Sequence, residues 1–270
     1  VTMPTQDMII GLYHLTSEGA PKPLVDPDGN EHLRSFISVA EARMAFDAGE
    51  IEIGTPIRLR VKDTAPPPGH PLPEGAEVTE DGVASEFVVD TTLGRAMFND
   101  ALPPNYPFVN DVVDKKRLSG IVNDLAERYT KVQVAASLDT LKDMGFYWAT
   151  RSGTTVAISD VMTPPRKADI LETYDAKAAK VQTQYERGLI TDDERRQELI
   201  EIWTQATNEV AKELETSMPT DNAIYRMVTS GARGNWFQLR QIAGMRGLMA
   251  NPKGEIIPRP IKSNFREGLS

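Results

Sequence analysis

The stretch that decides the fold is residues 168–217, ADILETYDAKAAKVQTQYERGLITDDERRQELIEIWTQATNEVAKELETS. Its apolar residues recur at steps of three and four in two runs, which is typical of helices with one buried face. They are Ile170, Leu171, Tyr174, Ala178, Val181 and Tyr185, then Leu199, Ile202, Trp203, Ala206, Val210 and Leu214. Gly188 interrupts the pattern, and Thr191 with Glu194 three residues later forms a capping box. We therefore predict an antiparallel hairpin of two long helices.

The remaining chain indicates a mixture of strands and shorter helices. Residues 57–62 alternate apolar and basic side chains, the period of a half-buried strand, and 86–92 predicts a second strand. The Pro- and Gly-rich segments 17–34 and 63–85 predict loops. Helices are predicted over 5–16, 39–48, 93–98, 111–129 and 137–145, the last ended by Gly145. The predicted class is α+β with a long helical hairpin.

Charge is distributed unevenly along the 270 residues, whose formal net charge is −9. Residues 222–270 carry eight basic and two acidic side chains. Such a basic segment indicates either a surface that faces phosphates or salt bridges inside a larger assembly. The chain has no cysteine, which excludes disulfides and thiolate zinc sites, and no apolar run long enough to span a membrane.

An autonomous active site is not visible in the sequence. His14, His32 and His70 lie far apart without metal-ligand spacing, and no phosphate-binding glycine motif or nucleophile motif is present. Paired carboxylates such as Asp192 and Asp193 lie in polar, solvated runs, which give no sign of a catalytic acid–base pair. We expect no metal or cofactor to be held by this chain alone.

Several motifs, in the same order and spacing, resemble the largest (beta-prime) subunit of bacterial RNA polymerases, and in detail its actinobacterial members. They are PTQDMIIGLY (4–13), TTLGR (91–95), YPFVN (106–110), GFYWATRSG (145–153), SGARG (230–234), QIAGMRGLM (241–249) and NFREGL (264–269). The resemblance covers the chain apart from the loops near 17–34 and 63–85. It implies an internal piece of that subunit.

The resemblance implies a division into three regions. Residues 1–165 are expected to form the pore-side region, 166–218 the funnel with its rim-helix hairpin, and 219–270 a basic segment that contains the F-loop and leads to the bridge helix. The family holds its catalytic Mg2+ with an Asn-Ala-Asp-Phe-Asp-Gly-Asp motif, which this sequence lacks. We therefore expect the metal ligands upstream of Val1, and no polymerase activity from this chain alone.

The resemblance also assigns roles to individual residues. Arg233 matches the position that contacts the triphosphate of the incoming nucleotide; the alternative is a structural arginine paired with a carboxylate. The F-loop positions that support catalysis are Arg240, Gln241, Arg246 and Pro252. The positions expected to dock regulators at the hairpin tip are Arg187, Asp192 and Asp193.

The implied setting is a cytoplasmic, nucleoid-associated DNA-directed RNA polymerase. Its expected partners are the beta, alpha and omega subunits, the sigma factor, template DNA, RNA, nucleoside triphosphates, coiled-coil regulators and transcript-cleavage factors; no membrane is expected. Two alternatives stay open. The chain could act mainly as a docking module for coiled-coil regulators, or it could be a helical scaffold protein unrelated to transcription.

Overall fold

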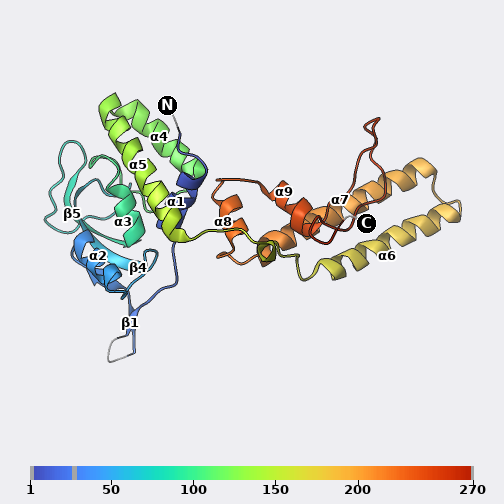
Figure 1. Ribbon diagram of the computed structural model, residues 1–270, viewed down its shortest axis with the longest axis horizontal. Helices are drawn as coiled ribbons and strands as arrows, with labels where there is room; N and C mark the ends of the chain where they lie inside the picture. Colours follow the sequence, from blue (N-terminus) through green and yellow to red (C-terminus); the bar gives the residue numbers. More distant parts are fainter. Residues whose placement is uncertain (1–2, 26–28, 269–270) are drawn as a thin grey trace. The chain divides into compact units, whose positions relative to one another are not determined.

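The computed structural model describes residues 3–25 and 29–268, so Leu269 of the last quoted motif lies outside the described residues. The chain forms two compact units (Figure 1). The first comprises Val1–Thr154 with Ser230–Ala232, and the second comprises Thr155–Thr229 with Arg233–Ser270. All named strands of the described residues belong to the first unit, and a helical hairpin dominates the second. The α+β prediction is confirmed.

A three-stranded sheet of order β3-β4-β5 organises the first unit. β3 (Arg34–Phe36) runs parallel to β4 (Pro56–Thr64), and β4 runs antiparallel to β5 (Ala84–Thr92). Burial alternates along β4, where Ile57, Leu59 and Val61 are buried while Arg58 and Arg60 between them face solvent. Both predicted strands are therefore confirmed, and each is longer than predicted.

The segment 17–34 is not a loop throughout, as the sequence predicted. It contains a small antiparallel pair, β1 (Leu24–Val25) and β2 (Glu31–His32). Both strands are exposed, so they have no alternation of buried and exposed side chains, and no sequence period marks them. The predicted loop 63–85 is confirmed in its interior, with β4 and β5 extending into its two ends.

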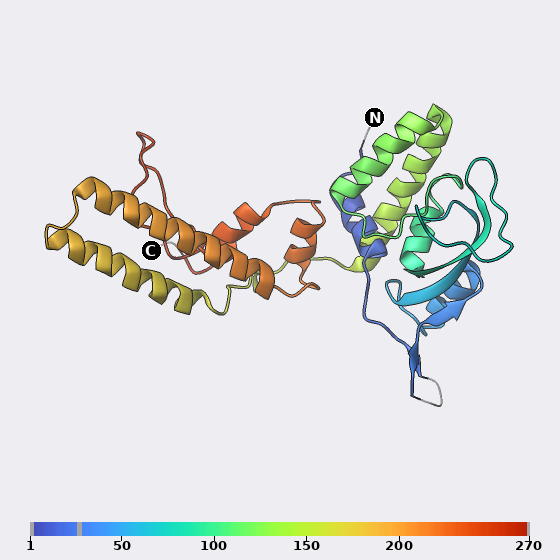
Figure 2. The same cartoon turned by 180° about the vertical axis from the view of Figure 1, so that it is seen from behind.

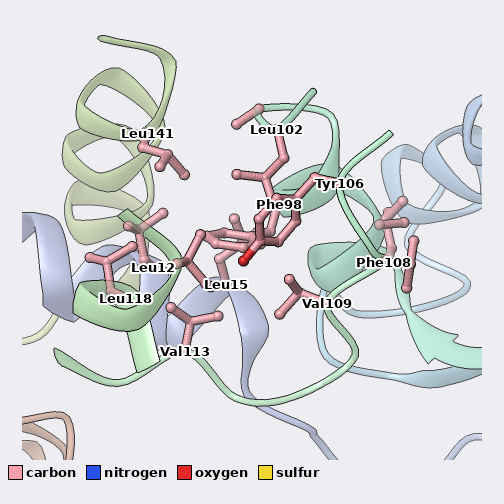
Figure 3. Close-up of a cluster of buried hydrophobic side chains, with 14 of the residues drawn as sticks. Leu12, Leu15, Phe98, Leu102, Tyr106, Phe108, Val109, Val113, Leu118 and Leu141 are labelled. Carbon is pink, nitrogen blue, oxygen red and sulfur yellow. The ribbon is translucent and has the colours of Figure 1, made fainter. Parts of the chain in front are cut away.

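Five helices share one hydrophobic core with this sheet in the first unit. They are α1 (Asp7–Thr16), α2 (Val39–Asp47), α3 (Leu93–Asn99), α4 (Lys115–Arg128) and α5 (Lys131–Ser152). Figure 3 shows part of the core, in which Leu12 and Leu15 of α1 lie among Phe98, Leu118 and Leu141. All five side chains are essentially inaccessible to solvent.

The predicted bounds of the helix over 137–145, with its end at Gly145, are wrong, because α5 runs from Lys131 to Ser152. Gly145 lies inside the helix, and the chain ends α5 at Gly153, which adopts the left-handed conformation with φ 60°. Gly145 instead permits a close crossing with α1. A Cβ on Gly11 would lie 1.8 Å from the Gly145 carbonyl oxygen, and a Cβ on Gly145 would lie 2.9 Å from the Met8 Cα atom.

The second unit contains the predicted hairpin, and Figures 1 and 2 show its two helices side by side. α6 (Lys167–Glu186) and α7 (Asp192–Ser217) are joined by a turn in which Gly188 has a φ of 70°. The capping box is present: Glu194 N donates to the Thr191 hydroxyl at 3.3 Å, and Thr191 N donates to the Glu194 carboxylate at 2.7 Å. The hairpin prediction is confirmed.

Short helices follow the hairpin. They are α8 (Ala223–Thr229), α9 (Trp236–Leu239) and the π-helix η2 (Arg240–Gly244), while the 3-10 helix η1 (Ile158–Asp160) precedes the hairpin. η2 packs on the base of α7. Gly244 faces Val210 and Leu214, so that a Cβ added there would meet their side chains at 3.5 to 3.7 Å. η2, which belongs to the basic segment, is therefore packed against α7 of the hairpin.

Candidate functional site

Arg233 lies in the turn between α8 and α9 and is exposed to solvent. Its backbone N donates to the Met227 carbonyl at 3.4 Å, and the flanking Gly231 and Gly234 have φ values of 72° and 78°. In the described part of the chain, its guanidinium has no hydrogen-bond or ion-pair partner. The planar, permanently charged group therefore keeps its donors open for a bidentate anion.

Arg240, Gln241 and Arg246 lie in and next to η2, and two of them contact Phe265, Gln241 at its backbone and Arg246 at its ring. Phe265 N donates to the Gln241 carbonyl at 3.2 Å, and the Arg246 guanidinium lies 5.0 Å from the centre of the Phe265 ring. The Arg240 guanidinium lies 4.7 Å from the centre of the Phe237 ring. Burial lowers the pKa of Arg240, and its Nε atom has no acceptor among the described residues.

Pro252 takes no part in these contacts. It is exposed in a turn closed by the bond from Gly254 N to the Asn251 carbonyl at 2.9 Å. The Asn251 side chain also accepts from the backbone N atoms of Lys253 and Glu255, each at 3.0 Å. Pro252 thus sits in a rigid surface turn, separate from the cluster around η2.

The hairpin tip carries the three predicted docking residues. Arg187 ends α6, and Asp192 and Asp193 begin α7, all exposed. The Asp192 carboxylate accepts from Arg195, whose guanidinium lies 4.5 Å from the Tyr185 ring centre. Leu189 in the turn is 69% exposed. An apolar side chain ringed by charges suits contact with another protein.

The sequence did not single out a partly buried polar cluster beside η2. It consists of Asn264, which is fully buried, Lys167, which is 7% exposed, and Glu267, whose carboxylate lies 2.7 Å from the Lys167 ammonium group. Asn264 and Glu267 lie in the quoted NFREGL motif, so the motif was a signal for both. No local pattern marks Lys167, because its partner is 100 residues away in the sequence.

Residues 1–161 match the family model "RNA polymerase Rpb1, domain 3", and residues 190–266 match "RNA polymerase Rpb1, domain 4". The chain belongs to the RNA polymerase Rpb1 family. The resemblance predicted from the motifs is confirmed, and the alternative of a scaffold unrelated to transcription is wrong.

Relatives of this Rpb1-family chain include proteins named DNA-directed RNA polymerase subunit beta'. The chain is 66% identical to that of Kineococcus radiotolerans, 63% to that of Beutenbergia cavernae and 62% to that of Nocardioides sp.. Each match covers 100% of this chain and 20% of the relative. The chain therefore spans about a fifth of the length of these curated relatives, which are all actinobacterial as the motifs indicated.

The Rpb1-family chain shows no metal centre within residues 3–25 and 29–268, where no group of three or more His, Asp or Glu side chains could hold an ion. His14 packs near Trp148, with ring centres 6.4 Å apart, and His70 Nε2 lies 2.7 Å from the Val88 carbonyl oxygen. Both rings therefore have structural neighbours. No helix among the described residues is long and apolar enough to cross a membrane.

Proposed function

We propose that this chain is part of the catalytic beta-prime subunit of a DNA-directed RNA polymerase, where it lines the channel that admits nucleotides and supports RNA synthesis. The observation that carries the proposal is the match of the full chain to subunits of that name, together with the Rpb1 domain matches over residues 1–161 and 190–266. Within it, we assign residues 1–165 to the pore side, 166–218 to the funnel and its rim helices, and 219–270 to the segment with the F-loop.

The polymerase reaction requires Mg2+ to clamp the attacking and leaving oxygens. The described side chains of this chain do not fit that role, since they form no ligand cluster. We therefore assign the metal ligands to another part of the subunit. The proposed partners are the beta, alpha and omega subunits, sigma factor, DNA and RNA. The proposed location of the assembled enzyme is the cytoplasm, in association with the nucleoid.

For Arg233 we propose contact with the triphosphate of the incoming nucleotide. Phosphoryl transfer depends mainly on positioning and on neutralising charge, and a guanidinium donates two parallel hydrogen bonds to phosphate. Arg233 is exposed, and the described part of the chain gives it no carboxylate, which supports this role over a structural ion pair. The segment around it is also the basic part of an acidic chain.

The test is nucleotide addition by assembled polymerase that carries Arg233→Ala, measured over a range of nucleotide concentrations. We expect kcat/KM to fall about tenfold or more, equivalent to roughly 1.4 kcal/mol, while assembly and DNA binding stay intact. Arg43→Ala, which removes an exposed cation on α2, is the matched control and should leave kcat/KM unchanged. An unchanged kcat/KM for Arg233→Ala would make Arg233 a structural residue.

A second candidate function is the docking of coiled-coil regulators and transcript-cleavage factors on the hairpin tip. The exposed Leu189 between Arg187 and the two aspartates favours it, because an apolar anchor with a charged rim is typical of transient interfaces. Arg187→Glu and Asp193→Lys should each weaken regulator binding by about tenfold and leave basal elongation unchanged. Glu215→Lys, far along α7, is the control. Equal affinities in all three variants would contradict docking at the tip.

A further inference from the structure

The end of η2 is capped by a segment that lies far along the chain. A helix leaves its last carbonyl groups without partners inside the helix, and these carbonyls need other donors when they are buried. Four successive carbonyls of η2 receive donors from residues 264–266. The pairs are Phe265 N to Gln241 O (3.2 Å), Arg266 N to Ile242 O (3.2 Å), and Asn264 Nδ2 to Ala243 O (2.8 Å) and to Gly244 O (3.1 Å).

Asn264 is held in the one orientation that makes this cap. Its side-chain oxygen accepts from Glu267 N at 2.8 Å, and its own backbone N donates to the Glu267 carboxylate at 3.2 Å. Because the oxygen is occupied by a donor, the amide nitrogen must face the carbonyls of η2. Asn264 is fully buried, so no water competes for these groups.

Lys167 connects the cap to the base of the hairpin. It is the first residue of α6, and its ammonium group lies 2.7 Å from the Glu267 carboxylate. The Lys167 side chain is only 8% exposed, so its charge depends on this partner. A continuous set of polar contacts thus runs from the start of α6 through Glu267 and Asn264 to the last turn of η2.

We propose that Asn264, Glu267 and Lys167 are positioning residues that fix η2, and with it Arg240 and Gln241, for nucleotide addition. π-Helices are rare and occur mostly at functional sites, and they depend on surroundings that compensate for their unusual hydrogen bonding. If the cap is lost, η2 can tighten toward the ordinary helical period, which turns Arg240 and Gln241 away from their present directions. The inference rests on the proposed role of these two residues in RNA synthesis.

The experiment uses assembled polymerase that carries Asn264→Asp. Aspartate keeps the volume and the acceptor for Glu267 N, but it places a carboxylate oxygen against the two carbonyls that the amide now serves. We expect kcat for nucleotide addition to fall about tenfold with KM unchanged, because Asn264 is buried away from substrate. Hydrogen exchange should quicken at the amides of residues 240–246 and stay unchanged at 199–210 of α7. Asn208→Asp, an exposed change on α7, is the matched control.

The ion pair provides a second, independent readout. Lys167→Met and Glu267→Gln should each lower kcat. Because both changes break the same contact, the kcat of the double variant should fall no further than that of the more impaired single variant. Losses that add up independently would overturn the coupling between the hairpin base and η2.

Arg240→Ala separates a failure of this inference from a failure of the proposed function. If Arg240→Ala lowers kcat while Asn264→Asp changes neither kcat nor exchange, the positioning role is wrong and the proposed function stands. If Asn264→Asp quickens exchange at 240–246 but neither variant lowers kcat, the proposed role of the F-loop residues in RNA synthesis is wrong.

Discussion

Substituting Gly11 by alanine should strongly destabilise the first unit, because Gly11 lies where α1 crosses α5. A Cβ at this position would lie 1.8 Å from the Gly145 carbonyl oxygen and 2.7 Å from Ala149 N. Both neighbours are backbone atoms of α5, so no side chain can rotate to make room. Helices α1 and α5 would have to separate.

The separation needed exceeds about 1 Å, because carbon and oxygen atoms rarely approach within roughly 3.4 Å without strain. A gap of this size forfeits about a quarter to a half of the dispersion energy between the surfaces that part. Those surfaces include Leu12 and Leu15 on α1 and Leu141 on α5, all fully buried. Overpacking generally costs about 1–3 kcal/mol, so we expect a loss of about 3 kcal/mol or more.

Trp148 provides the assay, since it is buried on α5 and is the single tryptophan of the first unit. With Trp203 and Trp236 replaced by phenylalanine, urea unfolding followed by Trp148 fluorescence reports on this unit. For a slope of about 2 kcal/mol per molar urea, a loss of 3 kcal/mol lowers the unfolding midpoint by about 1.5 M.

Gly120→Ala is the matched control, because Gly120 is exposed on α4 and a Cβ there meets no atom within 4 Å. In an open helical position, alanine should raise stability by up to about 1 kcal/mol. If Gly11→Ala lowers the free energy of unfolding by less than about 0.5 kcal/mol while Gly120→Ala raises it, the crossing of α1 and α5 is not as close as described.

Two further predictions concern single side chains. Burial, with help from a hydrogen bond to Asp124, raises the pKa of Tyr106 to about 12; the unfolded chain therefore loses this proton first, and stability should fall as pH rises from 10 to 12. Tyr106→Phe should flatten that fall in urea unfolding, and an equally steep fall would assign it to other groups. Thr191→Ala removes the capping box of α7, a loss of about 1 kcal/mol, seen as faster hydrogen exchange at residues 192–195. Unchanged exchange there would show that the cap is not formed in solution.

The parts of the fold that were predictable depend on signals that lie close together in the sequence. The hairpin needed only its two apolar stripes, Gly188 and the capping box at Thr191 and Glu194, and the structure has all of them. Strand β4 was equally visible, because alternation over six residues reports which face is buried. Charge along 222–270 likewise marked the segment that contains Arg233.

The prediction for α5 failed because glycine can either end a helix or permit close packing between two helices. Gly145 and Gly153 both lie in the helix-forming stretch that begins at Lys131, and glycine commonly ends helices. Gly153 is the end, with φ 60°, whereas Gly145 stays helical because α1 packs against it. That contact joins opposite ends of the first unit's sequence, so no local pattern distinguishes the two glycines.

The same reasoning limits what the sequence says about the candidate site. RQIAG at 240–244 has no local feature that predicts a π-helix, and the donors that complete it come from residues 264–266. Because a buried carbonyl without a donor costs about 1–3 kcal/mol, the geometry of η2 depends on Asn264 as much as on its own residues. A change at Asn264 therefore acts on Arg240 and Gln241 without replacing either. The tolerance of position 264 to substitution should follow the hydrogen bonds that it makes, rather than its distance from the nucleotide.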